Sequence, residues 1–151
     1  MALLNPYLNF NGDAEKAFLF YKSVFGGQFS RLVRFKDMPN TENPLSETDA
    51  NKIMHIALPI GRGNVLMATD FLESRGQKIV AGNRYSISIS AESKEEADKL
   101  FYGLSAGGTI EMPITDSNWG SYFGLLKDKF GIQWMVDFDQ RYKGKVEQSK
   151  K

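Results

Sequence analysis

The chain has 151 residues, and its 42% hydrophobic and 13% aromatic content is enough for one core of ordinary size. Its 19 basic and 18 acidic residues leave a net charge of +1, which removes the electrostatic reason to expect a nucleic-acid partner. Cys is absent, which excludes disulfides and thiolate chemistry. There is neither a cationic leader nor an apolar run that approaches the ~18 residues of a membrane span. We therefore expect a soluble, cytoplasmic protein with no membrane partner.

The first half of the chain is predicted to form a strand, a helix and three more strands. The helix is expected between Asp13, a possible N-cap, and the pair Gly26-Gly27, which would end it. The strands are expected at residues 7–10, 29–35, 53–60 and 64–70, with a hairpin turn at 61–63 between the last two. The stretch from Asp37 to Asn51 is polar and contains two prolines, so we interpret it as a long connection that could act as a lid.

The second half of the chain repeats this order. At one constant offset Glu15 aligns with Glu96, and the pair Gly26-Gly27 aligns with Gly107-Gly108, so a duplicated unit is the simplest explanation. The second helix is expected to begin at Ser93, with Glu96 as its capping-box partner. The strands of this half are expected at residues 84–91, 109–114, 121–126 and 132–138.

The repeat predicts an α+β fold in which two βαβββ units form a curled mixed sheet around a cleft. We expect one domain over residues 1–140, made of repeats at about 1–72 and 82–140. Residues 141–151 are rich in Lys and Arg, and we expect them to form a basic, flexible tail.

Strand alternation predicts which side chains face the cleft. In the second half Ile87 and Ile89 must face the helix, so the serines on either side of them face the opposite way. The same reasoning places Leu8 in the core of the first half. The residues expected to face the cleft are Tyr7, Asn9, Ser86, Ser88, Gln133, Met135 and Asp137. A bulge in the first strand would instead turn Leu8 and Phe10 towards the cleft, at a cost of roughly 1–3 kcal/mol for each polar group buried without a partner.

Several short motifs in a fixed order carry a family resemblance. They are Tyr7-Leu8-x-Phe10, Ala17 to Tyr21, Met54-His55, Gly107-Gly108 with Met112-Pro113, Asn118-Trp119-Gly120 and Phe130-Gly131-x-x-Trp134. With these motifs the chain resembles the vicinal oxygen chelate superfamily of glyoxalases, bleomycin-resistance proteins and extradiol dioxygenases, and within it the PhnB-like branch. The resemblance implies the glyoxalase/bleomycin resistance fold. It also implies a homodimer, because members of the superfamily usually cover the edges of their half-open sheets with a second copy.

The resemblance also locates the positions at which a metal would be bound. Metal enzymes of the superfamily hold one divalent ion with His and Glu side chains from the first and last strands of each half. In this chain those positions fall on Asn5 or Pro6, Met67, Ser86 and Met135. None of these side chains is a carboxylate or an imidazole, the ligands that such an ion needs. We therefore expect no bound metal and no other cofactor, with Met67 among the cleft candidates.

Five further residues have both a functional and a structural interpretation. His55 is the only histidine and is either a general base or donor at the sheet surface, or an ordinary strand residue. Asp70 either faces the mouth of the cleft or caps a turn. Trp119 and Tyr122 are candidate ligand contacts at the rim of the cleft, because Asn118-Trp119-Gly120 is typical of a turn, whereas Trp134 is expected in the core.

The leading hypothesis is a metal-free protein that holds an unidentified small molecule in its cleft, with or without catalysing a reaction. One alternative is a metal-dependent lyase, isomerase or dioxygenase in which His55, Asp70 and Asp137 converge on an ion. Another is a scaffold or regulatory dimer whose cleft is vestigial. A methyltransferase, an activity invoked by some names in this family, is disfavoured because no glycine-rich cofactor loop follows a strand.

Overall fold

The computed structural model describes residues 2–38 and 44–142. The chain divides into two compact units, Met1–Val80 and Ala81–Lys151, and the boundary falls between the two repeats expected from the sequence. Residues 39–43 of the expected lid and residues 143–151 of the expected tail lie outside the described residues. None of the helices in the described part of the chain is long and apolar enough to cross a membrane.

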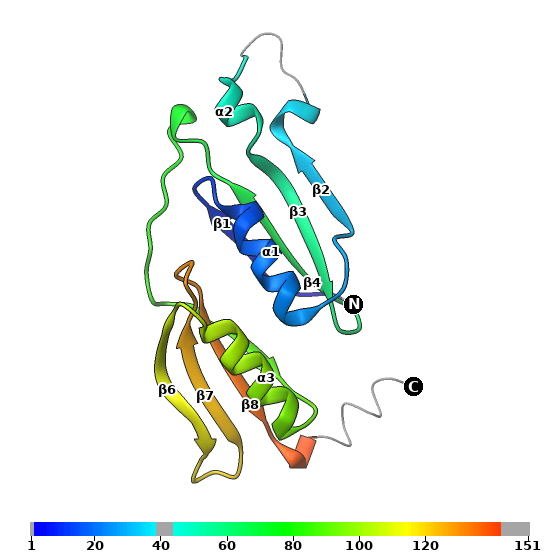
Figure 1. The fold of residues 1–151 in the computed structure, drawn as a ribbon, viewed down its shortest axis with the longest axis vertical. Coiled ribbons are helices and arrows are strands. Elements are labelled where there is room, and N and C mark those ends of the chain that lie inside the picture. Colours follow the sequence, from blue (N-terminus) through cyan, green and yellow to red (C-terminus); the bar gives the residue numbers. More distant parts are fainter. Residues whose placement is uncertain (1, 39–43, 143–151) are drawn as a thin grey trace. The chain divides into compact units, whose positions relative to one another are not determined.

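The first unit is one four-stranded mixed sheet with a helix on one face (Figure 1). Its elements are β1 (Tyr7–Phe10), α1 (Ala14–Phe25), β2 (Arg31–Arg34), η1 (Phe35–Asp37), α2 (Glu47–Ala50), β3 (Ile53–Ile60), β4 (Asn64–Asp70) and η2 (Glu73–Arg75). The strand order is β1-β4-β3-β2, in which β1 and β4 are parallel and the other two pairs are antiparallel.

The second unit repeats this topology. Its elements are β5 (Ile87–Ser90), α3 (Lys94–Ser105), β6 (Thr109–Asp116), β7 (Tyr122–Lys127), β8 (Gln133–Phe138) and η3 (Gln140–Tyr142). The strand order is β5-β8-β7-β6, and the edge strand β5 is again parallel to its neighbour β8. The predicted α+β fold of two βαβββ units is therefore confirmed.

Each helix buries one apolar stripe against one face of its own sheet. In the first unit Ala14, Ala17, Phe18 and Tyr21 of α1 are fully buried, and in the second Ala97, Leu100, Phe101 and Leu104 of α3 are buried. The approach in the second unit is so close that a Cβ on Gly124 of β7 would lie 2.6 Å from Cε2 of Phe101. Trp134 is 1% exposed in this core, as its strand position predicts.

The register of β1 agrees with the alternation expected from the sequence. Pairing with β4 is continuous from Tyr7 to Phe10, so no bulge interrupts it. Phe10 is 4% exposed, whereas Tyr7 is 46% exposed. Leu8 and Phe10 thus face the helix, and Tyr7 and Asn9 face away from it.

Helix α1 begins after Asp13, the expected N-cap residue, but its capping carboxylate is that of Asp70. The side chain of Asp13 makes no capping hydrogen bond. Instead, Oδ1 of Asp70, at the end of β4, accepts hydrogen bonds from the backbone N–H groups of Gly12 at 2.9 Å and Ala14 at 3.0 Å. Its Oδ2 accepts from the N–H of Ile53 at 2.9 Å. The prediction of an Asp13 side-chain cap is therefore wrong, and the sheet supplies the cap.

The second helix begins at the predicted cap Ser93, but Glu96 closes the turn on Glu92 rather than on Ser93 as a capping box would. The N–H of Glu96 donates to Oγ of Ser93 at 3.0 Å, and the carboxylate of Glu96 accepts from the N–H of Glu92 at 3.1 Å. Among the described residues of the stretch from Asp37 to Asn51 is a helix that the sequence analysis missed. This short helix, α2, begins where Oγ of Ser46 accepts from the N–H of Asp49 at 3.1 Å.

Candidate functional site

The open face of the first sheet, defined as the face opposite α1, brings four of the predicted residues together. The register joins Tyr7 to Met67, Met67 to Ala57 and Ala57 to Arg31, so these four side chains form one row across the four strands. Asn9, two residues after Tyr7 on β1, lies on the same face. His55, two residues before Ala57 on β3, does so as well.

Tyr7 and His55 are in direct contact on this face. The Tyr7 hydroxyl lies 3.4 Å from Nδ1 of His55, and the two ring centroids are 5.8 Å apart. His55 is half-buried, as is the adjacent Met67, while Ala57 between the large side chains is 4% exposed. Aromatic, imidazole and thioether groups thus share this face with the small Ala57.

Asp70 does not belong to this face. Its pairing with Phe10 and its bonds to Gly12 and Ala14 place it on the helix side of the sheet, where it is 2% exposed. It therefore lies on the side of the sheet opposite His55. The expectation that Asp70 faces the mouth of a cleft is therefore wrong, because both of its carboxylate oxygens accept hydrogen bonds from backbone amides.

The open face of the second sheet, opposite α3, gathers another group of the predicted residues. Ser88 pairs with Met135, and Gln133 and Asp137 lie two residues to either side of Met135 on β8. Asp137 accepts a hydrogen bond from Oγ of Ser90 at 3.1 Å, and Gln133 donates to Glu111 of β6 at 2.8 Å. Ser86 is exposed and precedes β5, which begins at Ile87, three residues later than predicted.

The aromatic residue that reaches this open face is Phe123, which the sequence analysis missed. Phe123 pairs with Asp137, and its ring lies 5.7 Å from that of Trp119, which is 59% exposed in the turn between β6 and β7. Tyr122 points to the helix side instead, where its hydroxyl donates to Asp98 of α3. This hydrogen bond, with the desolvation of the phenol, raises the pKa of Tyr122 to about 12. The placement of Tyr122 at a ligand rim is therefore corrected.

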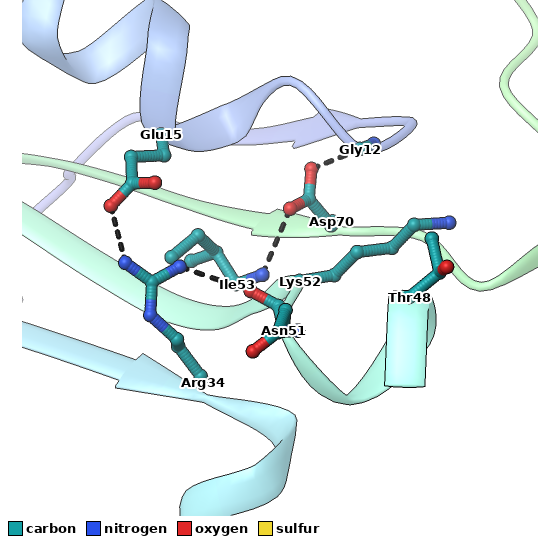
Figure 2. Close-up of a pocket in the computed structure, with 8 residues that line it drawn as sticks. All are labelled: Gly12, Glu15, Arg34, Thr48, Asn51, Lys52, Ile53 and Asp70. Carbon is teal, nitrogen blue, oxygen red and sulfur yellow. Dashed lines mark hydrogen bonds and ion pairs between the residues drawn. The ribbon is translucent and has the colours of Figure 1, made fainter. Parts of the chain in front are cut away.

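A separate small cavity lies at one end of the first unit (Figure 2). It has a volume of about 200 Å³ and is lined by Gly12, Glu15, Arg34, Thr48, Asn51, Lys52, Ile53 and Asp70. Arg34 forms an ion pair with Glu15 and donates to the carbonyl of Asn51 at 3.0 Å. Lys52 is paired with Asp49 at 3.0 Å. A hydrogen bond from Ser74 and the adjacent Lys52 lower the pKa of Asp49. The charges around the cavity are thus matched within the fold, and they tie α1, β2 and α2 together.

Asn5 and Pro6, the residues at the first of the expected metal positions, make hydrogen bonds within the first unit. The side-chain oxygen of Asn5 accepts from the N–H of Val65 at 3.0 Å, and the carbonyl of Pro6 accepts from the N–H of Met67 at 3.1 Å. Within residues 2–38 and 44–142, no group of three or more His, Cys, Asp or Glu residues is arranged to hold a metal ion.

Residues 3–137 match the family described as 3-demethylubiquinone-9 3-methyltransferase. The chain belongs to this family. It is 34% identical to protein PA1353 from Pseudomonas aeruginosa, with a TM-score of 0.81 over 92% of this chain and 98% of that one. It is 25% identical to a PhnB protein from Bacillus cereus that is named as a putative member of the same methyltransferase family, with a TM-score of 0.71 over 91% and 99% of the two chains.

A more distant structure supports the fold alone. A glyoxalase/bleomycin resistance protein from Albidiferax ferrireducens T118 is 17% identical, with a TM-score of 0.59 over 90% of this chain and 97% of that one. This PhnB-like chain therefore has the glyoxalase/bleomycin resistance fold that its sequence resembles.

The family description names a methyl transfer, which implies S-adenosylmethionine, and we tested whether the residues fit this cofactor. Nucleotide-type cofactors commonly bind at a glycine-rich turn that leads from a strand into a helix. The turn from β1 to α1 is Asn11-Gly12-Asp13, and the N–H of its one glycine is already bonded to Asp70. The turn from β5 to α3, Ala91-Glu92-Ser93, contains no glycine. These turns do not fit the cofactor, so we derive no step through it.

Proposed function

We propose that this PhnB-like protein binds a small molecule on the open face of its first sheet, without a bound metal, and acts as a binding protein rather than as a metalloenzyme. The observation that carries the proposal is the contact between Tyr7 and His55 on a sheet face that is partly exposed. A polar aromatic pair beside the half-buried Met67 offers both hydrogen bonds and apolar contact, as small-molecule sites do.

The chemistry of this face supports binding more than catalysis. His55 is the one histidine of the chain, and the four strands carry no Ser or Cys on this face. Their one aliphatic hydroxyl, that of Thr69, donates to the backbone carbonyls of Ile53 and Asp70, each at 3.4 Å. The metal-dependent alternative needs His55 and Asp70 at one ion, but these residues lie on opposite faces of the sheet. We further propose that the protein works as a homodimer, an assembly that would cover the edge strands β2 and β6.

The experiment combines elemental analysis with a fragment screen. After dialysis, we expect zinc, nickel, iron and manganese far below one ion per chain. In a ¹⁵N-labelled sample, small aromatic fragments should shift the backbone amide signals of Tyr7, His55 and Met67 more than those of the helix-facing Leu8 and Ile56. A stoichiometric metal that survives dialysis would overturn the metal-free proposal. A screen without a single fragment that shifts the open face would overturn the binding proposal.

A further inference from the structure

The strands of the first unit have an unequal distribution of charge. The sequences of β1, β2, β3 and β4 contain two arginines and one histidine, but only one carboxylate, that of Asp70. Asp70 is buried on the helix side and bonded to backbone amides. The open face of this sheet therefore carries cationic and neutral side chains from its own strands and no carboxylate.

The two arginines of β2 are used differently, although they are three residues apart. Arg34 forms an ion pair with Glu15 and bonds to the carbonyl of Asn51, so its charge is matched inside the fold (Figure 2). Arg31 is exposed, and among the described residues it has no hydrogen bond or ion pair through its side chain. Its guanidinium is thus the uncompensated charge of the open face.

The donors on this face lie close together. Arg31 pairs with Ala57, and His55 lies on the diagonal position of the same antiparallel pair, so their Cβ atoms are roughly 7 Å apart or less, within reach of a long side chain. When Nδ1 of His55 accepts from the Tyr7 hydroxyl, its Nε2 carries the hydrogen and is a donor. An anionic group can then meet the planar guanidinium fork and an imidazole N–H together.

The second unit supplies an internal comparison, because the two sheets have the same strand order, although β6 shifts register on either side of Met112 and β2 shifts between Val33 and Arg34. The row Tyr7–Met67–Ala57–Arg31 of the first sheet corresponds to the row Ser88–Met135–Leu125–Met112 of the second, and His55 corresponds to Phe123. The arginine is thus replaced by Met112, and the histidine by a phenyl ring. The second open face also carries the carboxylates of Glu111 and Asp137. Lys127, the one cation of the four strands, also lies on this face, opposite Gln133. The combination of an arginine with a histidine is therefore a property of the first face, and the shared fold does not require it.

We propose that the open face of the first sheet selects small organic anions, with a carboxylate or phosphate group on Arg31 and His55 and an apolar body over Tyr7 and Met67. This inference rests on the proposed function, since it names the class of ligand for the same face. In it, Arg31 and His55 contact the ligand, while Tyr7 is a positioning residue that holds the His55 ring.

The test uses three probes of nearly equal size and different charge: benzoate, benzamide and benzylamine. Phenyl phosphate is a fourth probe that separates carboxylate from phosphate binding. Each is titrated into the ¹⁵N-labelled full chain, and the amide signals of Arg31, His55 and Met67 are followed. We expect at least one of the two anions to bind about tenfold or more tightly than benzamide, and benzylamine to bind weakest, because charged bidentate bonds are the strong ones.

Matched variants identify the residue responsible. Arg31→Met introduces the residue that the second sheet carries at the corresponding position, so it should fold, and it should reduce anion affinity about tenfold to the level of benzamide. Arg31→Lys, which keeps the charge and loses the fork, should retain part of the preference. Arg34→Met should leave the preference for anions within about twofold while lowering stability, because its ion pair is structural.

Each outcome has a definite meaning. If benzamide shifts the same signals with the same affinity as the anions, or if Arg31→Met binds anions as the parent chain does, the anion proposal is wrong while the proposed function stands. If no probe and no fragment of the wider screen shifts the open face, both proposals are wrong.

Discussion

The buried carboxylate of Asp70 offers the sharpest test of how the first unit is held together. It accepts three backbone hydrogen bonds, from Gly12 and Ala14 through Oδ1 and from Ile53 through Oδ2, and it is 2% exposed. Two of the donors belong to the start of α1 and one to the start of β3. A single side chain at the end of β4 thus joins three elements.

The Asp70→Asn substitution keeps the shape of the side chain and changes its hydrogen bonding. The amide oxygen can still accept from Gly12 and Ala14, but the amide NH₂ then faces the N–H of Ile53, which leaves a buried donor without an acceptor. That loss costs about 1–3 kcal/mol. Removing the negative charge from the N-terminus of α1 adds about 0.3–2 kcal/mol. We therefore expect the free energy of unfolding to fall by about 1–5 kcal/mol.

Urea unfolding followed by far-ultraviolet circular dichroism measures this change, and Asp13→Asn is the matched control. Because the Asp13 side chain makes no capping bond, its substitution should cost less than about 1 kcal/mol. Hydrogen exchange at the Ile53 amide should accelerate in Asp70→Asn and stay unchanged in Asp13→Asn. A larger loss of stability from Asp13→Asn than from Asp70→Asn would refute the assignment of the cap to the sheet.

Two further predictions concern aromatic residues of the second unit. Trp134→Phe should lower the free energy of unfolding by about 1–3 kcal/mol, because it removes the buried hydrogen bond from Nε1 to Asp128 at 2.8 Å and leaves a void. Trp119→Phe, at an exposed position, should change it by less than about 0.5 kcal/mol. Equal effects of the two substitutions in urea unfolding would contradict these placements. Tyr122 has its pKa raised from 10.0 to about 12, so its stabilising bond to Asp98 should be fully present below pH 10 and lost as the pH rises towards 12. In an ultraviolet titration, the tyrosine that ionises at the highest pH should be absent from the Tyr122→Phe variant. An unchanged titration curve would show that this ionisation belongs to another tyrosine.

Sequence alternation was sufficient to predict most of the fold, because each helix requires an apolar face beneath it. The repeat and the periodicity of Ile87 and Ile89 gave the correct order of helices and strands and the correct sides of β1, β5 and β8, although Tyr122 of β7 was placed on the wrong side. The short helix α2 escaped prediction because its capping signal, Ser46 followed by Asp49, stands in a polar stretch with prolines. Strand ends were less predictable than strand identity, as the late start of β5 shows.

The candidate site was only partly predictable, because the predictions that failed concern contacts between residues far apart in the sequence. The capping role of Asp70 depends on amides that are far from it in the chain, so local patterns favoured the neighbouring Asp13. Tyr122 and Phe123 are adjacent and both aromatic, so composition alone could not decide which of them faces the helix. The contact between Tyr7 and His55 likewise joins two strands that are not adjacent in the sheet.

The two faces of each sheet differ in how freely their residues can change. On the helix side, the positions of Leu8, Ala68 and Ile56 correspond to Ile89, Val136 and Gly124, and all six remain apolar or small because a helix packs on them. On the open side, corresponding positions exchange arginine for methionine and histidine for phenylalanine. Packing therefore restricts the centre of the helix side in both units, although at the strand end Asp70 corresponds to Phe138, and it leaves the open side free to acquire a chemistry of its own. For this reason, a ligand preference in this fold has to be inferred from the open-face side chains of one unit, because the repeat itself does not determine it.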